Sequence, residues 1–269
     1  MSADGARLQS VLGRVARDPT LRDRFAQAPE ATLIELGLDE RERAGMLRHG
    51  PNRLLAYHEM VHSRMLGTIR TFIGGAAERL GRERLRADVD AWIAGPGPTT
   101  PYLRDIPAEF LVWARPRWQA DTSLPPWLAE LAAHQISIRT IRNDPREIGT
   151  PTGNKLDLDQ PIACNPTVRV VRYRWSVHRL PTPLAADDAP DEDQPIVVGH
   201  RDRNERPSFV QLEPRDAHLL ELLLAGKTLR EALFGACEAI GEALDDSILA
   251  ATALSLADWH DRHLLLGGA

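Results

Sequence analysis

The spacing of hydrophobic residues along the chain changes near Asn143. Before that point, apolar residues recur every three or four positions, which is typical of helices with one buried face. The Gly50-Pro51 step and the proline-rich run 95–101 interrupt this pattern and predict loops. The predicted helical segments are 8–15, 21–25, 31–36, 52–71, 76–94 with an interruption at Gly81, 106–113 and 127–141.

After Asn143 the period changes to two. Four apolar residues, Val171, Tyr173, Trp175 and Val177, alternate with polar ones and predict a half-buried strand. Further strands are predicted at 196–198 and 208–212. Helices are predicted at 216–225, from Thr228 onward, where Thr228 and Glu231 form a capping-box pattern, and at 247–263.

These elements predict an α+β protein. We expect an all-helical domain at 1–142 and a linker at 143–166, rich in proline and glycine, that wraps back on the surface. A winged-helix-like domain at 167–269 would then hold a small three-stranded antiparallel sheet and three helices.

Composition places the protein among cytoplasmic globular proteins. Of the 269 residues, 43% are hydrophobic and 26% charged. No uninterrupted apolar stretch approaches the roughly 18 residues of a membrane helix, and the first residues show no secretory signal. The two cysteines, Cys164 and Cys237, fit reduced thiols.

The charge distribution disfavours nucleic acid as a partner. Residues 1–150 hold 21 Lys and Arg against 19 Asp and Glu, whereas residues 151–269 hold 12 against 19. The last predicted helix carries Asp246, Asp258 and Asp261 against a single Arg262. A helix that enters the major groove normally presents Arg, Lys, Asn or Gln. A DNA-binding regulator therefore stays an alternative only because of the winged-helix-like element order.

One motif points to zinc chemistry. The segment from His58 to His62 matches H-E-x-x-H, in which two histidines one helical turn apart bind zinc and the glutamate activates water. A catalytic zinc also needs a third protein ligand, and residues 64–70 contain no histidine. Glu78 or Glu83 could serve, although nothing singles out either of them. A zinc hydrolase through His58 and His62 is thus the second alternative.

Several short segments resemble one protein family, the HvfC/BufC-like proteins, over about residues 50–265. The N-terminal domain of this family has carried a DNA-binding label. The segments in the first half are Arg53–Tyr57, Met60-Val61, Leu80-Gly81, Thr100–Leu103 and Pro126–Ala132. Those in the second half are Asn165–Arg169, Tyr173–His178, Phe209–Leu212, Leu219-Leu220 and Gly226–Leu229.

The resemblance implies a non-catalytic role in peptide natural-product biosynthesis. HvfC/BufC-like proteins, like the similar partner proteins of the methanobactin and thiaglutamate pathways, accompany multinuclear non-haem iron oxidative enzymes that modify ribosomally made peptides. The iron belongs to that enzyme, so no cofactor is expected in this chain. The family's second domain resembles a peptide-recognition element that captures the precursor's leader. The zincin-like motif falls on the family's Tyr57, Met60 and Val61 helix, for which the family implies no metal.

The candidate binding residues follow from this implied role. A small sheet with an open edge can accept an extended peptide as an additional strand, and a neighbouring helix can supply a groove. The residues expected to bind the leader are Ser208, Phe209, Val210, Gln211, Leu212, Leu249, Thr252, Ala253 and Leu256. Because aromatic residues often anchor interfaces, the enzyme contact is expected at Trp92, Trp113, Trp118 and Trp127.

Overall fold

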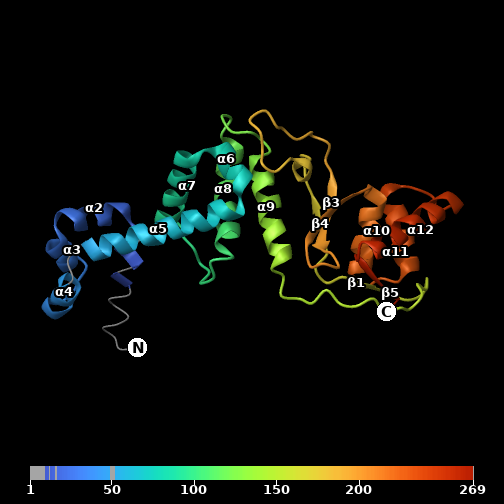
Figure 1. The fold of residues 1–269 in the computed structure, drawn as a ribbon, viewed down its shortest axis with the longest axis horizontal. Coiled ribbons are helices and arrows are strands. Elements are labelled where there is room, and N and C mark those ends of the chain that lie inside the picture. Colours follow the sequence, from blue (N-terminus) through green and yellow to red (C-terminus); the bar gives the residue numbers. More distant parts are fainter. Residues whose placement is uncertain (1–9, 12, 16, 49–51, 269) are drawn as a thin grey trace. The chain divides into compact units, whose positions relative to one another are not determined.

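The computed structural model describes residues 10, 11, 13–15, 17–48 and 52–268, which divide into two compact units (Figure 1). The first, here called the helical unit, ends at Ala132, and the second, the C-terminal unit, begins at Ala133. This boundary lies inside helix α9 (Leu128–Arg142), ten residues before the end of the helical domain expected from the sequence. Among the described residues, no helix has the length and apolar character that crossing a membrane requires.

The helical unit contains only helices among its described elements. In chain order they are α2 (Pro19–Gln27), α3 (Pro29–Glu35), α4 (Glu40–Leu47), α5 (Asn52–Phe72), α6 (Gly74–Leu80), α7 (Arg82–Ala94) and α8 (Ile106–Ala120), followed by the first turn of α9.

Short-range signals set the ends of these helices. Asp18 accepts hydrogen bonds from two first-turn N–H groups of α2, at 2.9 and 3.1 Å. A reciprocal capping box between Asp39 and Glu42 begins α4. Gly81 separates α6 from α7 with a φ of +82°, a conformation that strains any residue with a side chain.

Buried apolar side chains hold the helical unit together in two places. Around α2 and α3 they are Val11, Val15, Leu21, Phe25, Leu33 and Leu38. Between α7 and α8, the fully buried ring of Phe110 meets Trp92 and Trp118 edge-on, with centroids 5.7 and 5.9 Å away. Such edge-to-face pairs add to the free energy of burying the rings.

The C-terminal unit combines strands and helices, which confirms the predicted α+β class. Its elements are β1 (Ile162–Cys164), β2 (Arg169–Arg172), a 3₁₀ helix (Val177–Arg179), β3 (Ile196–Arg201), β4 (Pro207–Leu212), α10 (Pro214–Leu224), α11 (Leu229–Ile240), α12 (Asp246–Asp261) and β5 (Leu265–Gly268).

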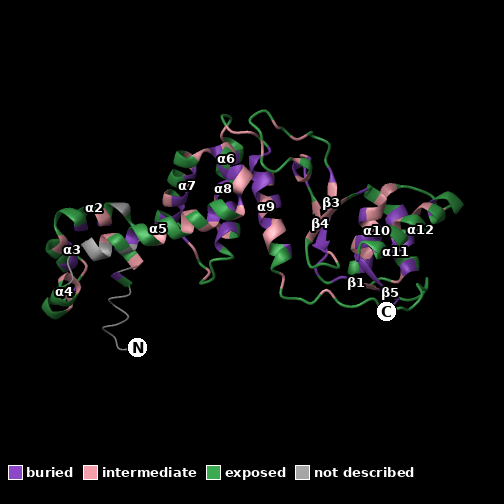
Figure 2. Ribbon diagram, in the orientation of Figure 1, coloured by how far each residue is buried: buried purple, intermediate pink, exposed green. Residues whose placement is uncertain are grey.

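The strands β2, β3 and β4 form an antiparallel sheet in that order, with β3 in the middle. β3 is buried from Val197 to Arg201, whereas β2 and β4 are half-exposed (Figure 2). The helices α10 to α12 pack on one face of this sheet, and α9 from Ala133 onward lies over the other (Figure 1). The core between the sheet and the helices α10 to α12 includes Val198, Leu212, Leu220 and Trp259.

The segment that was expected to be a linker is partly ordered onto the C-terminal unit. β1 lies within 143–166 and pairs antiparallel with β5. On the other side of β5, Thr152 donates its N–H to the carbonyl of Leu266 at 2.7 Å, and Gly268 donates to Asn154 at 3.3 Å. Gly267 has a φ of +122°, and a Cβ at this residue would collide with the side chain of Thr152. The stretch thus wraps onto the C-terminal strand.

The strand expected over Val171 to Val177 is shorter than predicted. β2 ends at Arg172, and the chain then turns away from β3 into the 3₁₀ helix. The loop 181–195, which carries five acidic residues, holds this turn. Ser176 donates its N–H to the carbonyl of Asp191 at 2.8 Å and its hydroxyl to Asp193 at 2.5 Å. The alternation of apolar residues there reflects burial of Tyr173 and Val177 in a turn rather than in a ladder.

Candidate functional site

Two of the sheet's three strands are edges, and β4 is one of them. Its residues pair with β3 on one side only, from Ser208 opposite His200 to Leu212 opposite Ile196. The five residues expected to bind a peptide on this strand, Ser208 to Leu212, therefore lie together along one outer edge. What this edge can bind depends on where its backbone groups point.

The direction of those groups follows from two hydrogen bonds. Tyr173 donates its N–H to the carbonyl of Pro195 at 3.0 Å, which continues the β2–β3 ladder, and Asp202 donates to Arg206 at 2.8 Å, which continues the β3–β4 ladder. Because partners alternate along an antiparallel ladder, Ser208, Val210 and Leu212 turn their backbone groups toward β3. The backbone groups of Phe209 and Gln211 consequently point outward, away from the sheet.

The side chains of β4 divide between the two faces of the sheet. Leu212 is buried in the core beside α10 to α12, and Val210 packs against the same core. Phe209 and Gln211 lie on the face that α9 covers. There the ring of Phe209 meets His134 at a centroid distance of 4.7 Å, and Gln211 accepts a hydrogen bond from Arg179 at 2.7 Å.

Helix α12 lies close to the sheet and has one accessible side. His200 on β3 donates from Nε2 to the carbonyl of Arg262 at 2.8 Å, and Ser255 donates to Asp216 on α10 at 2.7 Å. Of the four α12 residues expected at the groove, Thr252 and Leu256 are buried.

The other two, Leu249 and Ala253, are exposed. They belong to a surface of α12 on which the exposed apolar residues are Leu249, Ala250, Ala253, Leu254 and Ala257. Only this surface is available to a partner, while Thr252 and Leu256 act in packing.

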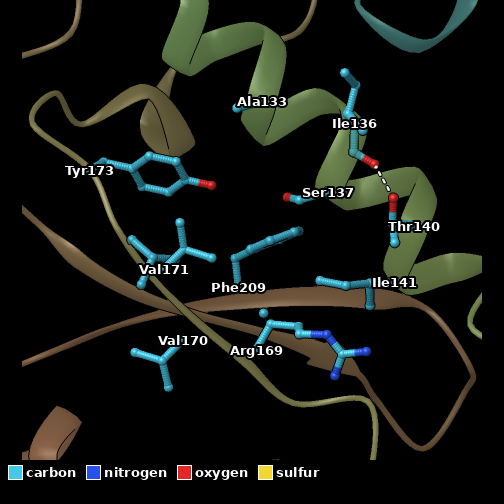
Figure 3. Close-up of a pocket in the computed structure, with 12 residues that line it drawn as sticks. Ala133, Ile136, Ser137, Thr140, Ile141, Arg169, Val170, Val171, Tyr173 and Phe209 are labelled. Atoms are coloured by element: carbon cyan, nitrogen blue, oxygen red, sulfur yellow. Dashed lines mark hydrogen bonds between the residues drawn. The ribbon is translucent and has the colours of Figure 1, made fainter. Parts of the chain in front are cut away.

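On its α9 face the sheet encloses a cavity of about 310 Å³, which sequence inspection did not predict (Figure 3). Its lining is largely apolar, and it draws on α9 and all three strands of the sheet. The residues that line it are Ala133, Ile136, Ser137, Thr140, Ile141, Arg169, Val170, Val171, Tyr173, Val197, Gly199 and Phe209.

The polar groups around this cavity are already paired within the protein. Ser137 donates its hydroxyl to the carbonyl of His134 at 2.7 Å, and Thr140 donates to Ile136 at 3.0 Å. The Tyr173 hydroxyl lies 3.1 Å from Nδ1 of His134. Burial lowers the pKa of His134 to about 4, with His178 contributing in the same direction, so this imidazole is neutral near pH 7. The cavity therefore suits an apolar group.

The four tryptophans expected to contact a partner enzyme occupy different environments. Trp92, Trp118 and Trp127 are buried, and the indole N–H of Trp118 donates to Asp88 at 2.8 Å. Trp113 is half-buried, and the guanidinium of Arg117 stacks 4.0 Å from its ring. Next to it, Val112 is 77% exposed. Of the four, only Trp113 is placed to touch a partner directly, beside Val112.

The two histidines of the motif, His58 and His62, are buried within the helical unit, whereas Glu59 and Met60 between them are exposed. The two imidazole rings stack with centroids 4.1 Å apart, and Nδ1 of His62 lies 2.7 Å from Oδ1 of Asp90. Burial, followed by the nearby His62 and Arg22, lowers the pKa of His58. Over the residues that the structure describes, no three His, Cys, Asp or Glu side chains are grouped so that they could hold a metal ion. The third ligand of a zinc hydrolase is not supplied by these residues.

Comparison with known proteins identifies the C-terminal unit. Residues 165–260 match the family model described as the HvfC C-terminal domain, a span that runs from just before β2 to the last turn of α12. A search of curated proteins finds no match for the chain. The match lies within the C-terminal unit, which contains both sheet edges and α12, and it supports an HvfC/BufC-like family assignment for residues 165–260.

Proposed function

We propose that this protein is a non-catalytic adaptor that binds the leader of a ribosomally synthesised precursor peptide and presents it to a multinuclear non-haem iron oxidative enzyme. The family match is consistent with an accessory role. In this proposal the iron and the oxidative chemistry belong to the partner, and this chain contributes recognition without a cofactor of its own.

The observation that carries the proposal is the outer edge of β4. Phe209 and Gln211 turn their backbone N–H and C=O groups outward, and no hydrogen bond within the described residues reaches those groups. An extended peptide satisfies such groups by adding as a strand, and its affinity comes largely from main-chain hydrogen bonds. The exposed Leu249 and Ala253 on α12 would then contact alternate side chains of the leader.

The test is a titration of the full chain with its own precursor. The precursor is sought as a short cysteine-containing open reading frame beside an iron-oxidase gene and is labelled at its C-terminus. We expect saturable binding that is retained when only the leader portion is used, and co-purification of the chain with the neighbouring oxidase. Absence of leader binding would overturn the proposal. Salt-sensitive binding to duplex DNA without peptide binding would instead favour a regulator.

A further inference from the structure

We infer that the cavity beneath α9 and the outer edge of β2 together form a second site for an extended peptide, one that buries a large apolar residue. This site lies at the opposite edge of the sheet from β4. The inference does not rest on the proposed function, since it concerns different backbone groups and a different face.

The cavity reaches the edge of β2. Val170 lines the cavity, although its side chain packs against the core on the opposite face of the sheet. Figure 3 shows Val170 and Val171 pointing to opposite sides of the strand, with Val171 on the cavity side. The cavity is therefore bordered by the edge of β2 itself. On the β4 side the ring of Phe209 closes it, because a Cβ on Gly199 would lie only 2.7 Å from that ring.

The backbone of β2 turns hydrogen-bonding groups outward at this edge. Since Tyr173 donates its N–H to Pro195, the alternation of the ladder turns Val171 toward β3 and leaves Val170 and Arg172 with outward N–H and C=O groups. No hydrogen bond described for the chain reaches these outward groups. A strand added here would exchange hydrogen bonds with Val170 and Arg172. Its residue opposite Val171 would place its side chain on the cavity side of the sheet.

The lining of the cavity restricts the chemistry of the occupant. The lining is mainly aliphatic, and its hydroxyls are bonded to α9 or to His134, so a polar side chain would lose hydrogen bonds with water and gain none. A volume of about 310 Å³ accommodates one large apolar side chain with its flanking backbone. The inserted residue is therefore of the leucine, methionine or phenylalanine type.

Charge defines the flanks of the occupant. Residues 165–179 include Arg169, Arg172, Arg174 and Arg179 and no acidic residue. Arg169 and Arg172 remain about half-exposed although Asp144 and Glu221 pair with them. Arg174 and Arg179 are likewise paired, with Glu192 and Asp193. Since each of these arginines already has an acidic partner, neutral flanks are compatible with this edge.

The test uses the isotope-labelled full chain and a blocked heptapeptide that has a central leucine, two threonines on each side and a glutamate at each end. We expect the amide signals of Val170 and Arg172 and the methyl signals of Ile136 and Val171 to shift on titration. Replacing the central leucine by serine should weaken binding about tenfold or more, the scale of burying one apolar side chain.

Matched variants separate the cavity from the edge. Ser137→Phe fills the cavity and should abolish the shifts, whereas Ser137→Ala removes the same hydroxyl without filling it and should bind normally. In the peptide, the backbone nitrogens of the two residues that flank the central leucine can be methylated. This change leaves the protein itself unaltered and should also abolish binding.

Three outcomes would overturn the inference. The first is that the N-methylated peptide binds as well as the parent peptide. The second is that a folded Ser137→Phe protein binds with unchanged affinity. The third is that the shifts fall on Phe209 and Gln211 instead, which would move peptide addition to the β4 edge and leave the proposed function intact.

Discussion

His134 on α9 and Tyr173 just after β2 are joined by a hydrogen bond of 3.1 Å between Nδ1 and the phenolic oxygen, and both residues are buried. The two rings also meet edge-on, with centroids 5.7 Å apart. The pair connects the helix on one side of the cavity to the strand on the other. It thereby holds Tyr173, which lines the cavity, against α9.

Replacing that imidazole should change how stability depends on pH. The pKa of His134 is about 4 in the folded chain and 6.5 ordinarily, so between these values the unfolded state binds a proton that the folded state does not. Stability from this residue is complete above pH 6.5 and is lost as the pH falls toward 4. The two pKa values correspond to roughly 3 kcal/mol. His134→Gln should flatten the pH dependence of the unfolding free energy, measured by urea denaturation.

The matched control for this variant is His218→Gln. His218 lies on α10 with its side chain 38% exposed, and it serves as a histidine outside the buried cluster. The wild type and this control should lose stability in parallel between pH 6.5 and 4. If the unfolding free energy of His134→Gln fell with pH as steeply as that of the wild type, the buried neutral imidazole would not determine the acid sensitivity of the fold.

A proline at Gln211 should weaken leader binding without unfolding the protein. The N–H of Gln211 points outward from β4, so its loss leaves the β3–β4 ladder intact, and an edge strand tolerates proline there. The expected loss of leader affinity is roughly 1 to 3 kcal/mol, the scale of an unsatisfied polar group. Fluorescence anisotropy with the labelled precursor measures it, and circular dichroism checks the fold.

Gln211→Ala distinguishes the backbone from the side chain. This variant keeps the outward N–H but loses the hydrogen bond from Arg179. We expect it to bind the leader almost as the wild type does. Equal losses in Gln211→Ala and Gln211→Pro would mean that the side chain, not strand addition, determines recognition.

Substitutions at two leucines on α12 should affect different properties, one the stability of the fold and the other the binding of the leader. Leu256 is buried in the core of the C-terminal unit, so Leu256→Ala should cost about 2 to 5 kcal/mol of unfolding free energy. Leu249 is 43% exposed, so Leu249→Glu should leave stability within about 0.5 kcal/mol yet weaken leader binding. Chemical denaturation and peptide titration of both variants measure the two effects. Unchanged affinity in Leu249→Glu would remove the exposed face of α12 from the binding site.

Local patterns were sufficient to predict most of the elements. The strand expected at 208–212 is β4 (Pro207–Leu212), and the helix expected at 247–263 is α12 (Asp246–Asp261). Both are encoded by short-range periodicity and caps, such as Asp245, whose side chain accepts the N–H of Ile248 at 2.9 Å. The pairing of β1 with β5 was not predicted, because it joins Ile162 to Gly268 across more than a hundred positions and each strand is too short to show a period.

The site was predicted less completely than the fold. Sequence inspection selected β4 but could not assign its faces, because which pair is buried depends on the register of Val197 and Val198 on the neighbouring strand. The cavity was missed since it depends on Gly199 lying beneath Phe209 of the paired strand and beneath Ile141, which is distant in the sequence. Gly199 directly follows the strand predicted at 196–198 and lies inside β3. It was the one local signal, since a glycine within a strand often marks a close approach.

The purified chain should carry no stoichiometric metal. His58 and His62 stack on each other, and His62 is engaged by Asp90, so the pair lacks the converging third ligand of a zinc site in the described residues. Elemental analysis of the full chain purified without chelator is the measurement. One equivalent of zinc that disappears in His58→Ala would contradict both this prediction and the non-catalytic assignment.

The contact with the proposed partner enzyme should include the exposed side of α8 around Val112 and Trp113. Val112 is 77% exposed, and Trp113 is half-buried beneath Arg117, whereas Trp92 and Trp118 pack around Phe110. Val112→Glu should therefore abolish co-purification of the oxidase while the thermal midpoint stays near that of the wild type, because a charge enters the apolar centre of a contact.

Trp92→Ala should instead lower the free energy of unfolding by about 3 to 5 kcal/mol. Ala87→Glu, which adds the same charge at an exposed position on α7, is the matched control and should co-purify normally. Normal co-purification with Val112→Glu would exclude this side of α8 from the contact.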